Sequence, residues 1–416
     1  MLWGLANKMP SNINPEKPLR LGVVGMGRAF TVMLPTFIKD TRIDIVAGAD
    51  PRQEARSQFE RDFGGAAYET CQMLLDNSDI DIVYLATPAE LHVEQIKIIA
   101  AAGKHVLLEK PMALTIEDGQ KINRIVKRAG IHLIVGHSHG FNQPIQQTRE
   151  LIKSGEFGKL QMLTALNYTD FMYRPRRPDE LITEKGGGVV FSQAAHQIDI
   201  IRILGGGCVK SIRANAGRWD ATRDTEGAYN ALFTFENGVT ASATYSGYAH
   251  FDSDEFMEWS GELGNQKNPD TYWQPRKKMD AQLSDMVEAD LKASQNFGGK
   301  NYAPQVGHQN EPLQHQHFGT IIASCEKADI RPMPWGVVIY GDEERNHDQL
   351  SIPVVPRSEV MDEIINTVNH NTYPIHDGAW ALANLEVTLA ILESSRTQKE
   401  ITLKYQVSST RDANDE

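Results

Sequence analysis

The stretch LRLGVVGMGRAF, residues 19–30, decides the fold of the first part of this chain. Its first six residues are an apolar run typical of a buried strand, and Gly25-Met26-Gly27 closes that run before a helix-forming segment begins. Two glycines in such a turn let backbone N–H groups approach a pyrophosphate at the positive end of the following helix. An ordinary tight turn between strand and helix is the alternative interpretation. The candidate phosphate-binding residues are Gly25, Met26, Gly27, Arg28, Ala29 and Phe30.

Two further residues refine this prediction. Phe30 stands where the dinucleotide-binding fingerprint has a third glycine, which leaves the closest helix-to-strand packing in question but keeps the two phosphate-contacting glycines. Asp50 ends the next apolar run, where a carboxylate accepts hydrogen bonds from adenosine ribose hydroxyls and repels the extra phosphate of NADP. The sequence therefore predicts a site for NAD in preference to NADP. Arg52 leaves an alternative open, because it either holds a 2′-phosphate or is a solvated residue in the first turn of a helix.

Beyond this site the chain alternates apolar runs with amphipathic segments as far as residue 137. The runs at 43–50, 80–88, 105–111 and 131–137 are predicted strands, and the segments between them carry apolar residues at helical spacing. Strands that are apolar throughout and separated by helices form a parallel sheet covered on both faces. We therefore expect a doubly wound α/β domain over residues 19–138.

A different pattern follows in the rest of the chain. Asn237-Gly238 predicts an antiparallel turn, and the elements around it form a second domain over residues 139–405 with a mostly antiparallel sheet. An insertion is expected at 265–317, and flexible tails at 1–18 and 406–416. The predicted strands cover 159–170, 209–219, 226–238, 239–250 and 400–405, and the predicted helices cover 144–154, 191–204, 279–291 and 380–395.

The composition excludes several classes of protein. A chain of 416 residues is too long for a single core. Lys and Arg number 42 against 54 Asp and Glu, a net charge of -12, and such an acidic surface repels nucleic acids. The three cysteines are far apart, which fits a reducing compartment, and no apolar run approaches the roughly 20 residues that cross a bilayer. We expect a cytoplasmic protein whose partner is a small molecule rather than a nucleic acid or a membrane.

Glu109-Lys110-Pro111 is the first candidate for chemistry. It follows a predicted parallel strand, so Lys110 lies at the carboxyl edge of the sheet, where open α/β folds place their ligands. A partly desolvated lysine beside a nicotinamide cation has a lowered pKa and can exchange a proton with a substrate hydroxyl. A surface lysine at the end of a strand is the alternative.

Taken in order, these motifs resemble those of the Gfo/Idh/MocA family. The resemblance rests on Gly25-x-Gly27, on Ala86-Thr87-Pro88 followed by His92, on Glu109-Lys110-Pro111, and on Gly186-Gly187-Gly188 followed by His196 and Asp199. It implies an N-terminal Rossmann domain, a C-terminal α/β domain whose open sheet forms a homo-oligomer interface, and NAD(P)-dependent oxidation of an alcohol, usually on a sugar or polyol. It places Lys110 and His196 in the catalytic positions. It places Thr87, Pro88, His92, Glu109 and Lys110 beside the cofactor.

The chain departs from the family pattern at Ser192, where family members often have an aspartate four residues before the histidine. On an α-helix Ser192, His196 and Asp199 share one face, which we expect to point toward the substrate. Either Asp199 orients His196, or the proton relay is simpler in this chain. A packed helix histidine is the alternative interpretation of His196.

Further stretches, such as DFMYRPRRPDEL and TYSGYAHFDSDEF, resemble the phthalate 4,5-cis-dihydrodiol dehydrogenase subgroup. This resemblance implies a ring cis-diol with two carboxylates as the substrate and a catechol as the product. Arginine forks grip carboxylates. The candidate substrate-binding loop therefore contains Tyr173, Arg174, Arg176 and Arg177, with a solvated loop that pairs with Asp179 and Glu180 as the alternative.

The histidines near residues 137–139 and 308–317 raise the question of a metal site. No carboxylate or thiolate shares a ligand spacing with them, so no metal is expected, and His139 is predicted to line the substrate site. Three other functions stay open. They are a sugar or glycoside dehydrogenase, a hydrolase or isomerase that retains its NAD, and an NAD-binding sensor, although a sensor has no need of Lys110 and His196.

Overall fold

The computed structural model describes residues 17–136, 139–271, 274–280, 285–303 and 314–410. Contacts divide the chain into two compact units. The first contains Met1–Gly136, Ser294–Ala303 and Val360–Ala381, and the second contains His137–Ala293, Pro304–Glu359 and Leu382–Glu416. We expected one continuous second domain over 139–405, whereas residues 294–303 and 360–381 belong to the first unit. Such returns depend on long-range packing, which leaves no local signal in the sequence.

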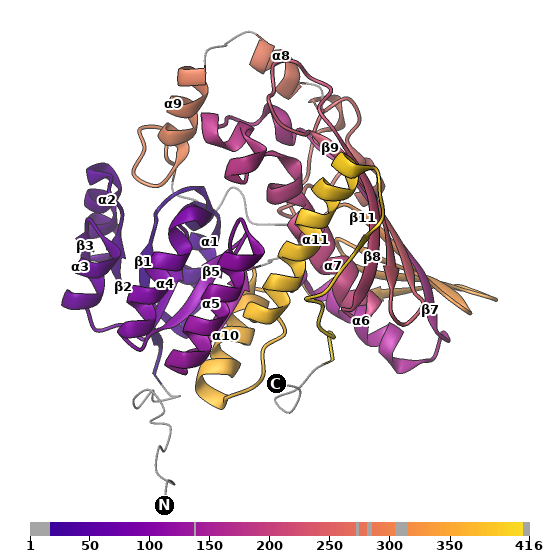
Figure 1. Cartoon of the computed structure of the whole chain (residues 1–416), viewed down its shortest axis with the longest axis horizontal. Coiled ribbons are helices and arrows are strands. Elements are labelled where there is room, and N and C mark those ends of the chain that lie inside the picture. Colours follow the sequence, from indigo (N-terminus) through magenta and orange to yellow (C-terminus); the bar gives the residue numbers. More distant parts are fainter. Residues whose placement is uncertain (1–16, 137–138, 272–273, 281–284, 304–313, 411–416) are drawn as a thin grey trace, which may run out of the picture. The chain divides into compact units, whose positions relative to one another are not determined.

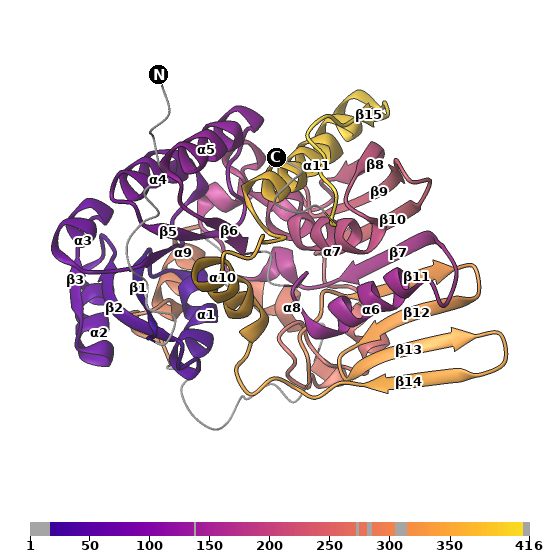
Figure 2. The ribbon, with the colours of Figure 1, turned by 90° about the horizontal axis from the view of Figure 1, so that it is seen from below.

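The first unit is built on a parallel sheet of six strands in the order β3-β2-β1-β4-β5-β6. The five predicted strands are confirmed, and the short edge strand β3 was missed because three residues carry no periodicity. Helices α4 and α5 cover one face of this sheet and α1 and α10 the other (Figure 2). The strands are β1 Leu19–Val24, β2 Ile43–Ala49, β3 Ala66–Tyr68, β4 Ile82–Leu85, β5 His105–Glu109 and β6 Leu133–Gly136.

Helices connect the strands of this unit, and α5 has clear signals at both of its ends (Figure 1). Thr115 caps α5 by accepting a hydrogen bond from the Asp118 N–H, and Gly130 ends it in the left-handed conformation. The same helix carries acidic residues in its first turn and basic residues in its last, which complements the helix dipole. The helices are α1 Arg28–Lys39, α2 Gln53–Phe63, α3 Cys71–Asn77, α4 His92–Ala101, α5 Ile116–Ala129 and α10 Ser358–His370, with the short η1 Ala89–Leu91 before α4.

The second unit contains a nine-stranded sheet in the order β14-β13-β12-β11-β7-β10-β9-β8-β15. The predicted antiparallel pairing of β9 with β10 through Asn237-Gly238 is confirmed, and Gly238 has the positive φ of 89° that this turn requires. The sheet is mostly antiparallel, because β7 and β10 pair parallel while the other neighbours run antiparallel. The strands are β7 Leu160–Tyr168, β8 Val209–Gly217, β9 Ala228–Phe235, β10 Thr240–Ser246, β11 Thr320–Cys325, β12 Ala328–Met333, β13 Gly336–Gly341, β14 Arg345–Gln349 and β15 Ile401–Thr402.

Strands β11 to β14 were not predicted. Strand β14 has the wholly polar sequence RNHDQ, and the antiparallel ladder of β13 holds it in place although it has no apolar face. Alternation is clear only in the central strands. In β9 the side chains of Ala231, Phe233 and Phe235 are buried, while Leu232 between them is 62% exposed. One face of the sheet is therefore packed and the other is open.

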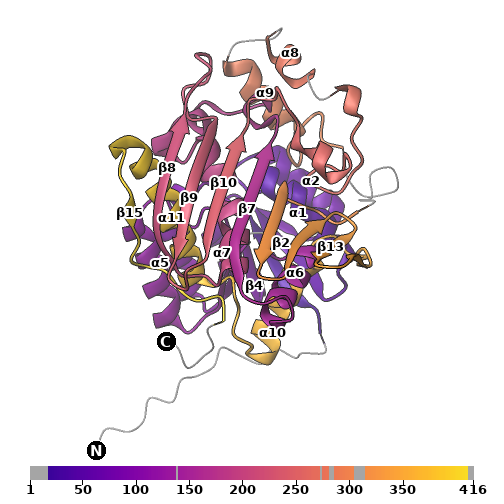
Figure 3. The ribbon, with the colours of Figure 1, turned by 90° about the vertical axis from the view of Figure 1, so that its right-hand side faces the viewer.

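Helices lie behind the packed face, as Figure 3 shows for α6 and α7. The predicted helix at 144–154 is confirmed as α6 Gln143–Ser154 and ends at Gly155, which has φ 72°. The predicted helix at 191–204 is also present, but it begins as a π-helical turn at Val190–Ala194 before continuing as α7 Ala195–Gly205. The C-terminal helix is α11 Gly378–Thr397.

The insertion and the tails are described in part. Helices α8 Gln274–Asp280 and α9 Asp285–Gln295 lie in the predicted insertion, and residues 281–284 between them fall outside the described residues, as does the tail at 1–16. The prediction of a flexible tail from 406 onward is wrong for 406–410. The Val407 carbonyl accepts a hydrogen bond from buried Arg202, and the Ser409 N–H donates to the Gly206 carbonyl.

Candidate functional site

The candidate cofactor residues lie at the carboxyl ends of four adjacent strands in the first unit. Gly25 follows β1, Asp50 follows β2, Thr87 follows β4 and Lys110 follows β5. The order β2-β1-β4-β5 makes these four loops neighbours along one edge of the sheet. Open α/β sheets bind their ligands at this edge, where the strand order reverses.

The turn after β1 is shaped for close approach to a phosphate group. Gly25 has φ 91°, and a Cβ atom there would lie 2.7 Å from the Ala86 carbonyl oxygen, so only glycine fits. Gly27 begins α1, no side chain caps that helix, and a Cβ at Gly27 would meet no atom within 4 Å. The space beside Gly27 at the N-terminus of α1 is therefore open, and the N-terminus of a helix is where a pyrophosphate binds.

Asp50 is fixed by the same turn. Its side chain is almost fully buried, with Oδ2 accepting from the Met26 N–H at 2.8 Å and Oδ1 from the Arg52 N–H at 2.9 Å. The Arg52 guanidinium also donates to both oxygens, at 3.0 and 3.1 Å. Arg52 is thus paired with Asp50, which neither of its two predicted roles included.

The predicted cofactor residues divide by burial. The side chains of Met26 and Phe30 are fully buried, so of these two only backbone atoms are available to a ligand, while Arg28 is exposed. The Glu109 carboxylate accepts a hydrogen bond from the Tyr84 hydroxyl at 2.7 Å, and the Lys110–Pro111 peptide bond is cis.

His92 has a positioning role in this edge of the sheet. Its Nε2 lies 2.9 Å from the Thr87 carbonyl oxygen and its Nδ1 lies 3.1 Å from the Met112 carbonyl oxygen. Burial lowers the pKa of His92. The ring therefore lies between the loop that carries Thr87 and Pro88 and the loop that follows Lys110, and in its neutral form it donates to one of the two carbonyls.

In the second unit, His196 is packed among aromatic rings. Its ring centroid lies 4.9 Å from that of His139, edge to face, and 5.0 Å from that of Phe318. The Phe318 ring in turn stacks on Tyr245 at 6.1 Å. We predicted from the sequence that His139 and His196 belong to one site. The structure adds Phe318 and Tyr245 to their neighbours, and no sequence motif indicated these two residues.

The protonation of His139 follows from its neighbours. The Asn142 amide nitrogen donates to the Gln316 carbonyl at 2.8 Å, which fixes the orientation of that amide, and it also donates to His139 Nδ1 at 3.3 Å. His139 Nε2 then carries the hydrogen and donates to Glu262 Oε1 at 3.3 Å. Burial lowers the pKa of His139, so the ring is neutral. Glu262 was missed because it lies in a polar stretch without motif spacing.

Ser192 and Asp199 differ from the prediction. Ser192 lies within the π-helical turn, so its spacing to His196 is not that of an α-helix. Asp199 is fully buried, and its Oδ1 accepts from the Asn384 amide at 3.0 Å, while Asn384 Oδ1 accepts from Arg202 at 2.7 Å. The three residues therefore do not form the polar α-helical face that we expected. Asp199 is buried instead and is hydrogen-bonded to Asn384, which in turn binds Arg202.

The arginine loop separates into three environments. Arg174 donates to Asp170 at 2.8 Å, and its Nη1 lies 3.6 Å from Glu262 Oε2, which places it beside the Glu262–His139 pair. Arg176 lies over the Phe171 ring at 3.6 Å, and burial lowers its pKa to about 10. Arg177 is exposed and pairs with Glu180 at 3.6 Å.

Tyr173, next to Arg174 in the chain, has a different set of partners. Its hydroxyl donates to Asp220 at 2.5 Å and accepts from Arg276, and its side chain is buried. The alternative interpretation had the loop pairing with Asp179 and Glu180. Arg177 does pair with Glu180, whereas Asp179 pairs with Lys185 at 2.6 Å. Internal contacts therefore hold much of this loop, and Arg174 is the arginine that lies beside Glu262, the partner of His139.

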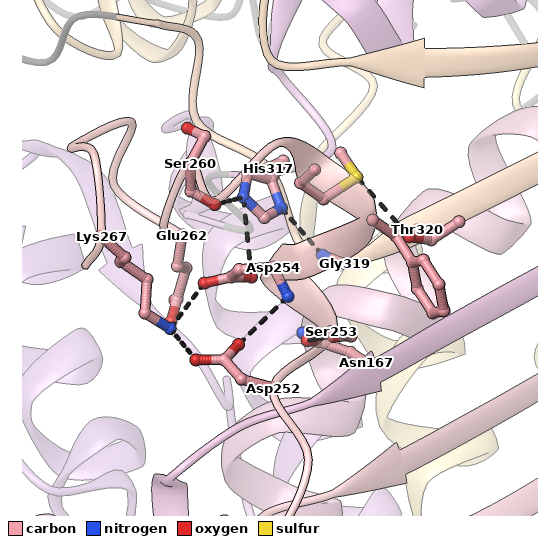
Figure 4. A network of polar contacts seen from close by, with 12 residues as sticks. Asn167, Asp252, Ser253, Asp254, Ser260, Glu262, Lys267, His317, Gly319 and Thr320 are labelled. Atoms are coloured by element: carbon pink, nitrogen blue, oxygen red, sulfur yellow. Dashed lines mark hydrogen bonds and ion pairs between the residues drawn. The ribbon is translucent and has the colours of Figure 1, made fainter. Parts of the chain in front are cut away.

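A cavity of 310 Å³ borders Asp170 in the second unit. Asp252 and Lys267 also line it, and Lys267 reaches between Asp252 and Asp254, with 2.8 Å to Asp254 (Figure 4). His317 donates from Nε2 to the Ser260 carbonyl and accepts the Gly319 N–H at Nδ1. Residues 137 and 308 fall outside the described residues, and within the described ones no group of three His, Cys, Asp or Glu side chains has the arrangement of a metal site.

Both parts of the chain match a known protein family. The pattern of the oxidoreductase family with an NAD-binding Rossmann fold matches residues 19–137, and that of the GFO/IDH/MocA C-terminal domain matches residues 145–266. The chain belongs to the GFO/IDH/MocA family. It is an oxidoreductase whose Rossmann unit binds NAD. Within the described residues no helix combines the length and the apolar character needed to cross a membrane.

Individual relatives extend this similarity. The chain is 44% identical over 381 residues to 1-carboxy-3-chloro-3,4-dihydroxycyclohexa-1,5-diene dehydrogenase of Comamonas testosteroni, which covers 91% of this chain and 96% of the relative. A crystal structure of a candidate dehydrogenase from Bordetella bronchiseptica superposes with a TM-score of 0.87 at 35% identity, covering 93% of this chain and all of the other. The WlbA dehydrogenase of Bordetella pertussis, solved with NADH and UDP-GlcNAcA, shares the fold with a TM-score of 0.64 at 22% identity, covering 93% and 99%.

Proposed function

We propose that this oxidoreductase oxidises a secondary hydroxyl of a carboxylated cyclic cis-diol with NAD, yielding a catechol. The observation that carries this proposal is the 44% identity to a dehydrogenase whose name specifies a cyclohexadiene ring with one carboxyl group, two hydroxyls and one chlorine. Lys110 and His196 are the proposed catalytic residues. Ser192, Asp199, Tyr173, Arg174, Arg176, Arg177 and His139 are the proposed substrate-binding or substrate-positioning residues.

The chemistry assigns the chain two tasks. Oxidation of a secondary alcohol removes a hydride from carbon and a proton from oxygen, and NAD supplies the hydride acceptor when bound. We assign the proton to Lys110 at Nζ or to the imidazole of His196. The resulting ketone loses a proton from the neighbouring carbon and gains one on oxygen, and aromaticity drives that tautomerisation.

The substrate carboxylate needs a cation, and Arg174 is the best placed candidate. It lies beside the Glu262–His139–His196 cluster, and its contact with Glu262 at 3.6 Å is longer than a hydrogen bond. A substrate carboxylate can therefore take the place of Glu262 at Nη1 as a stronger, charge-assisted partner. Arg176 and Arg177 are less suited, because one lies over an aromatic ring and the other faces solvent.

We further propose that the protein prefers NAD to NADP, that it forms a homo-oligomer, and that it works in the cytoplasm. Asp50 stands where the adenosine ribose binds and repels a 2′-phosphate. The open face of the nine-stranded sheet carries Leu232 at 62% and Met162 at 47% exposure, apolar area that a second copy would cover. Cys71, Cys208 and Cys325 are all free thiols, which fits a reducing compartment.

A substrate panel tests the proposal. NADH absorbance is recorded at fixed NAD with carboxylated cis-dihydrodiols, with the same rings lacking the carboxylate, and with common sugars and glycosides. We expect net NADH formation and the highest kcat/KM for a carboxylated ring. Faster oxidation of a sugar, or turnover without net NADH, would refute the dihydrodiol assignment.

A further inference from the structure

Residues 294–303, which we call the strap, belong to the first unit and pack on its helices α1 and α2. Phe297 is fully buried there, with its ring 5.2 Å from Phe30 edge to face and 6.3 Å from Phe63. The Phe297 N–H donates to the Thr31 hydroxyl at 3.2 Å. The strap is thus anchored on α1 and α2, directly behind the phosphate-binding turn.

The strap explains the departure from the dinucleotide fingerprint at Phe30. A glycine at that position would remove the edge-to-face contact between the Phe297 ring and α1, and would leave the edge-to-face contact with Tyr302 within the strap. Gly298 completes the fit, because it has φ 78° and a Cβ atom there would lie 2.7 Å from the Ala55 Cα. Phe30 and the strap are therefore complementary parts of one packed contact.

The strap also reaches the residue that decides between cofactors. Arg52 Nη1 donates to the Phe297 carbonyl at 3.4 Å, and Nη2 donates to the Met26 carbonyl at 2.8 Å. The same guanidinium donates from Nε and Nη2 to the two oxygens of Asp50. Arg52 thus has two sets of partners, the Asp50 carboxylate and a pair of backbone carbonyls.

Asp50 is saturated in this arrangement. A carboxylate offers about four lone-pair positions. Two accept the backbone N–H groups of Met26 and Arg52, and two accept the Arg52 guanidinium. A ribose hydroxyl that binds Asp50 must displace guanidinium contacts, after which Arg52 keeps only the carbonyls of Met26 and Phe297.

We propose that Phe297 is a cofactor-specificity residue, because its carbonyl holds Arg52 in place and so withholds the guanidinium from the 2′-phosphate of NADP. An arginine free to move beside the ribose accommodates that phosphate. An arginine held by the strap cannot move to the 2′-phosphate. The phosphate is then repelled by the Asp50 carboxylate, and no cation compensates for that repulsion. The inference rests on the NAD preference proposed above and deepens it.

Direct binding tests the inference without any substrate. Dissociation constants for NADH and NADPH are measured by fluorescence titration on the full chain, so failure of the dihydrodiol proposal leaves the result intact. Phe297→Ala keeps the carbonyl but removes the ring that anchors the strap on Phe30 and Phe63, so the strap should no longer hold Arg52 in place. The ratio of the NADPH to the NADH dissociation constant should then fall by roughly tenfold, the scale of one charge-assisted hydrogen bond. In an Arg52→Ala background the same substitution should leave the ratio unchanged.

Arg56 supplies the matched control. It also lies beside Asp50 and donates to the Asp50 and Pro51 carbonyls at 2.8 Å and to the Gln53 side chain, and among the described residues it makes no hydrogen bond to the strap. The effect of Phe297→Ala should therefore persist in an Arg56→Ala background. A ratio that stays within about twofold in Phe297→Ala, well below the scale of one such bond, or an effect that persists without Arg52, would overturn the proposal. If Phe297→Ala is unfolded at the temperature of the titration, Gly298→Ala replaces it, because a side chain at Gly298 also displaces the strap. The same change in the dissociation-constant ratio, and the same dependence on Arg52, are then expected.

Discussion

Arg174→Ala tests the substrate carboxylate most directly. The arginine donates to Asp170 at 2.8 Å and lies 3.6 Å from Glu262, and its side chain is 41% exposed. A hydrogen bond to a charged group contributes on the order of 1.5 to 3 kcal/mol, or roughly 10- to 150-fold in kcat/KM. Because solvent screens a side chain of this exposure, we expect the lower end, about tenfold.

The assay compares two substrates and three variants. Initial NADH formation gives kcat/KM for a carboxylated cis-dihydrodiol and for the same ring without the carboxylate. The loss in Arg174→Ala should be confined to the carboxylated ring, and Arg174→Lys should recover part of it because the charge is kept. Arg177→Ala gives the comparison within the same loop, and its loss should be smaller than that of Arg174→Ala, since its side chain is 54% exposed and pairs with Glu180.

Two results would refute the reasoning. Equal losses for both rings would mean that Arg174 supports the Glu262–His139 pair rather than the carboxylate. A kcat/KM for the carboxylated ring within about twofold of the unaltered protein, far below one charge-assisted bond, would exclude the carboxylate role. Thermal unfolding of each variant separates both results from a loss of folded protein, because Asp170 loses its partner in Arg174→Ala.

Three further predictions concern the cofactor side and stability. Lys110→Ala should lower kcat by roughly 100-fold or more, the usual scale of acid–base catalysis, with the NADH dissociation constant nearly unchanged; a raised KM at full kcat would assign Lys110 to binding. Asp50→Ala should narrow the preference for NADH over NADPH in direct titrations, and an unaltered protein that binds both equally would contradict the assignment. Burial, and then the neighbouring His132, lower the pKa of His105 to about 4. The folded protein therefore holds His105 neutral, and protonation of the unfolded chain favours unfolding. The free energy of unfolding should be unaffected by His105 above pH 6.5 and should decrease as the pH falls from 6.5 toward 4. The cost should reach about 2 kcal/mol at pH 5, and His105→Gln should show a flatter dependence of unfolding free energy on pH.

The sequence determined what local chemistry requires. Gly25 is needed because any side chain there would clash with the Ala86 carbonyl. Asp50 directly follows a strand that its apolar residues predict, so its position at the carboxyl end of that strand could be predicted as well. The Asn237-Gly238 turn likewise specifies its own hairpin, because a positive φ is available there without strain. Each of these features depends on residues close together in the chain, so a pattern of a few residues carries it.

Only the tertiary structure decided the features that join distant residues. The Glu262–His139 pair, the strap at Phe297 and the parallel pairing of β7 with β10 link positions separated by tens to hundreds of residues. The π-helical turn before His196 is equally invisible in the sequence, since its residues read as an ordinary helix. Such contacts form because side chains fill space and satisfy buried polar groups in the folded chain, and no local periodicity encodes which distant partner they meet.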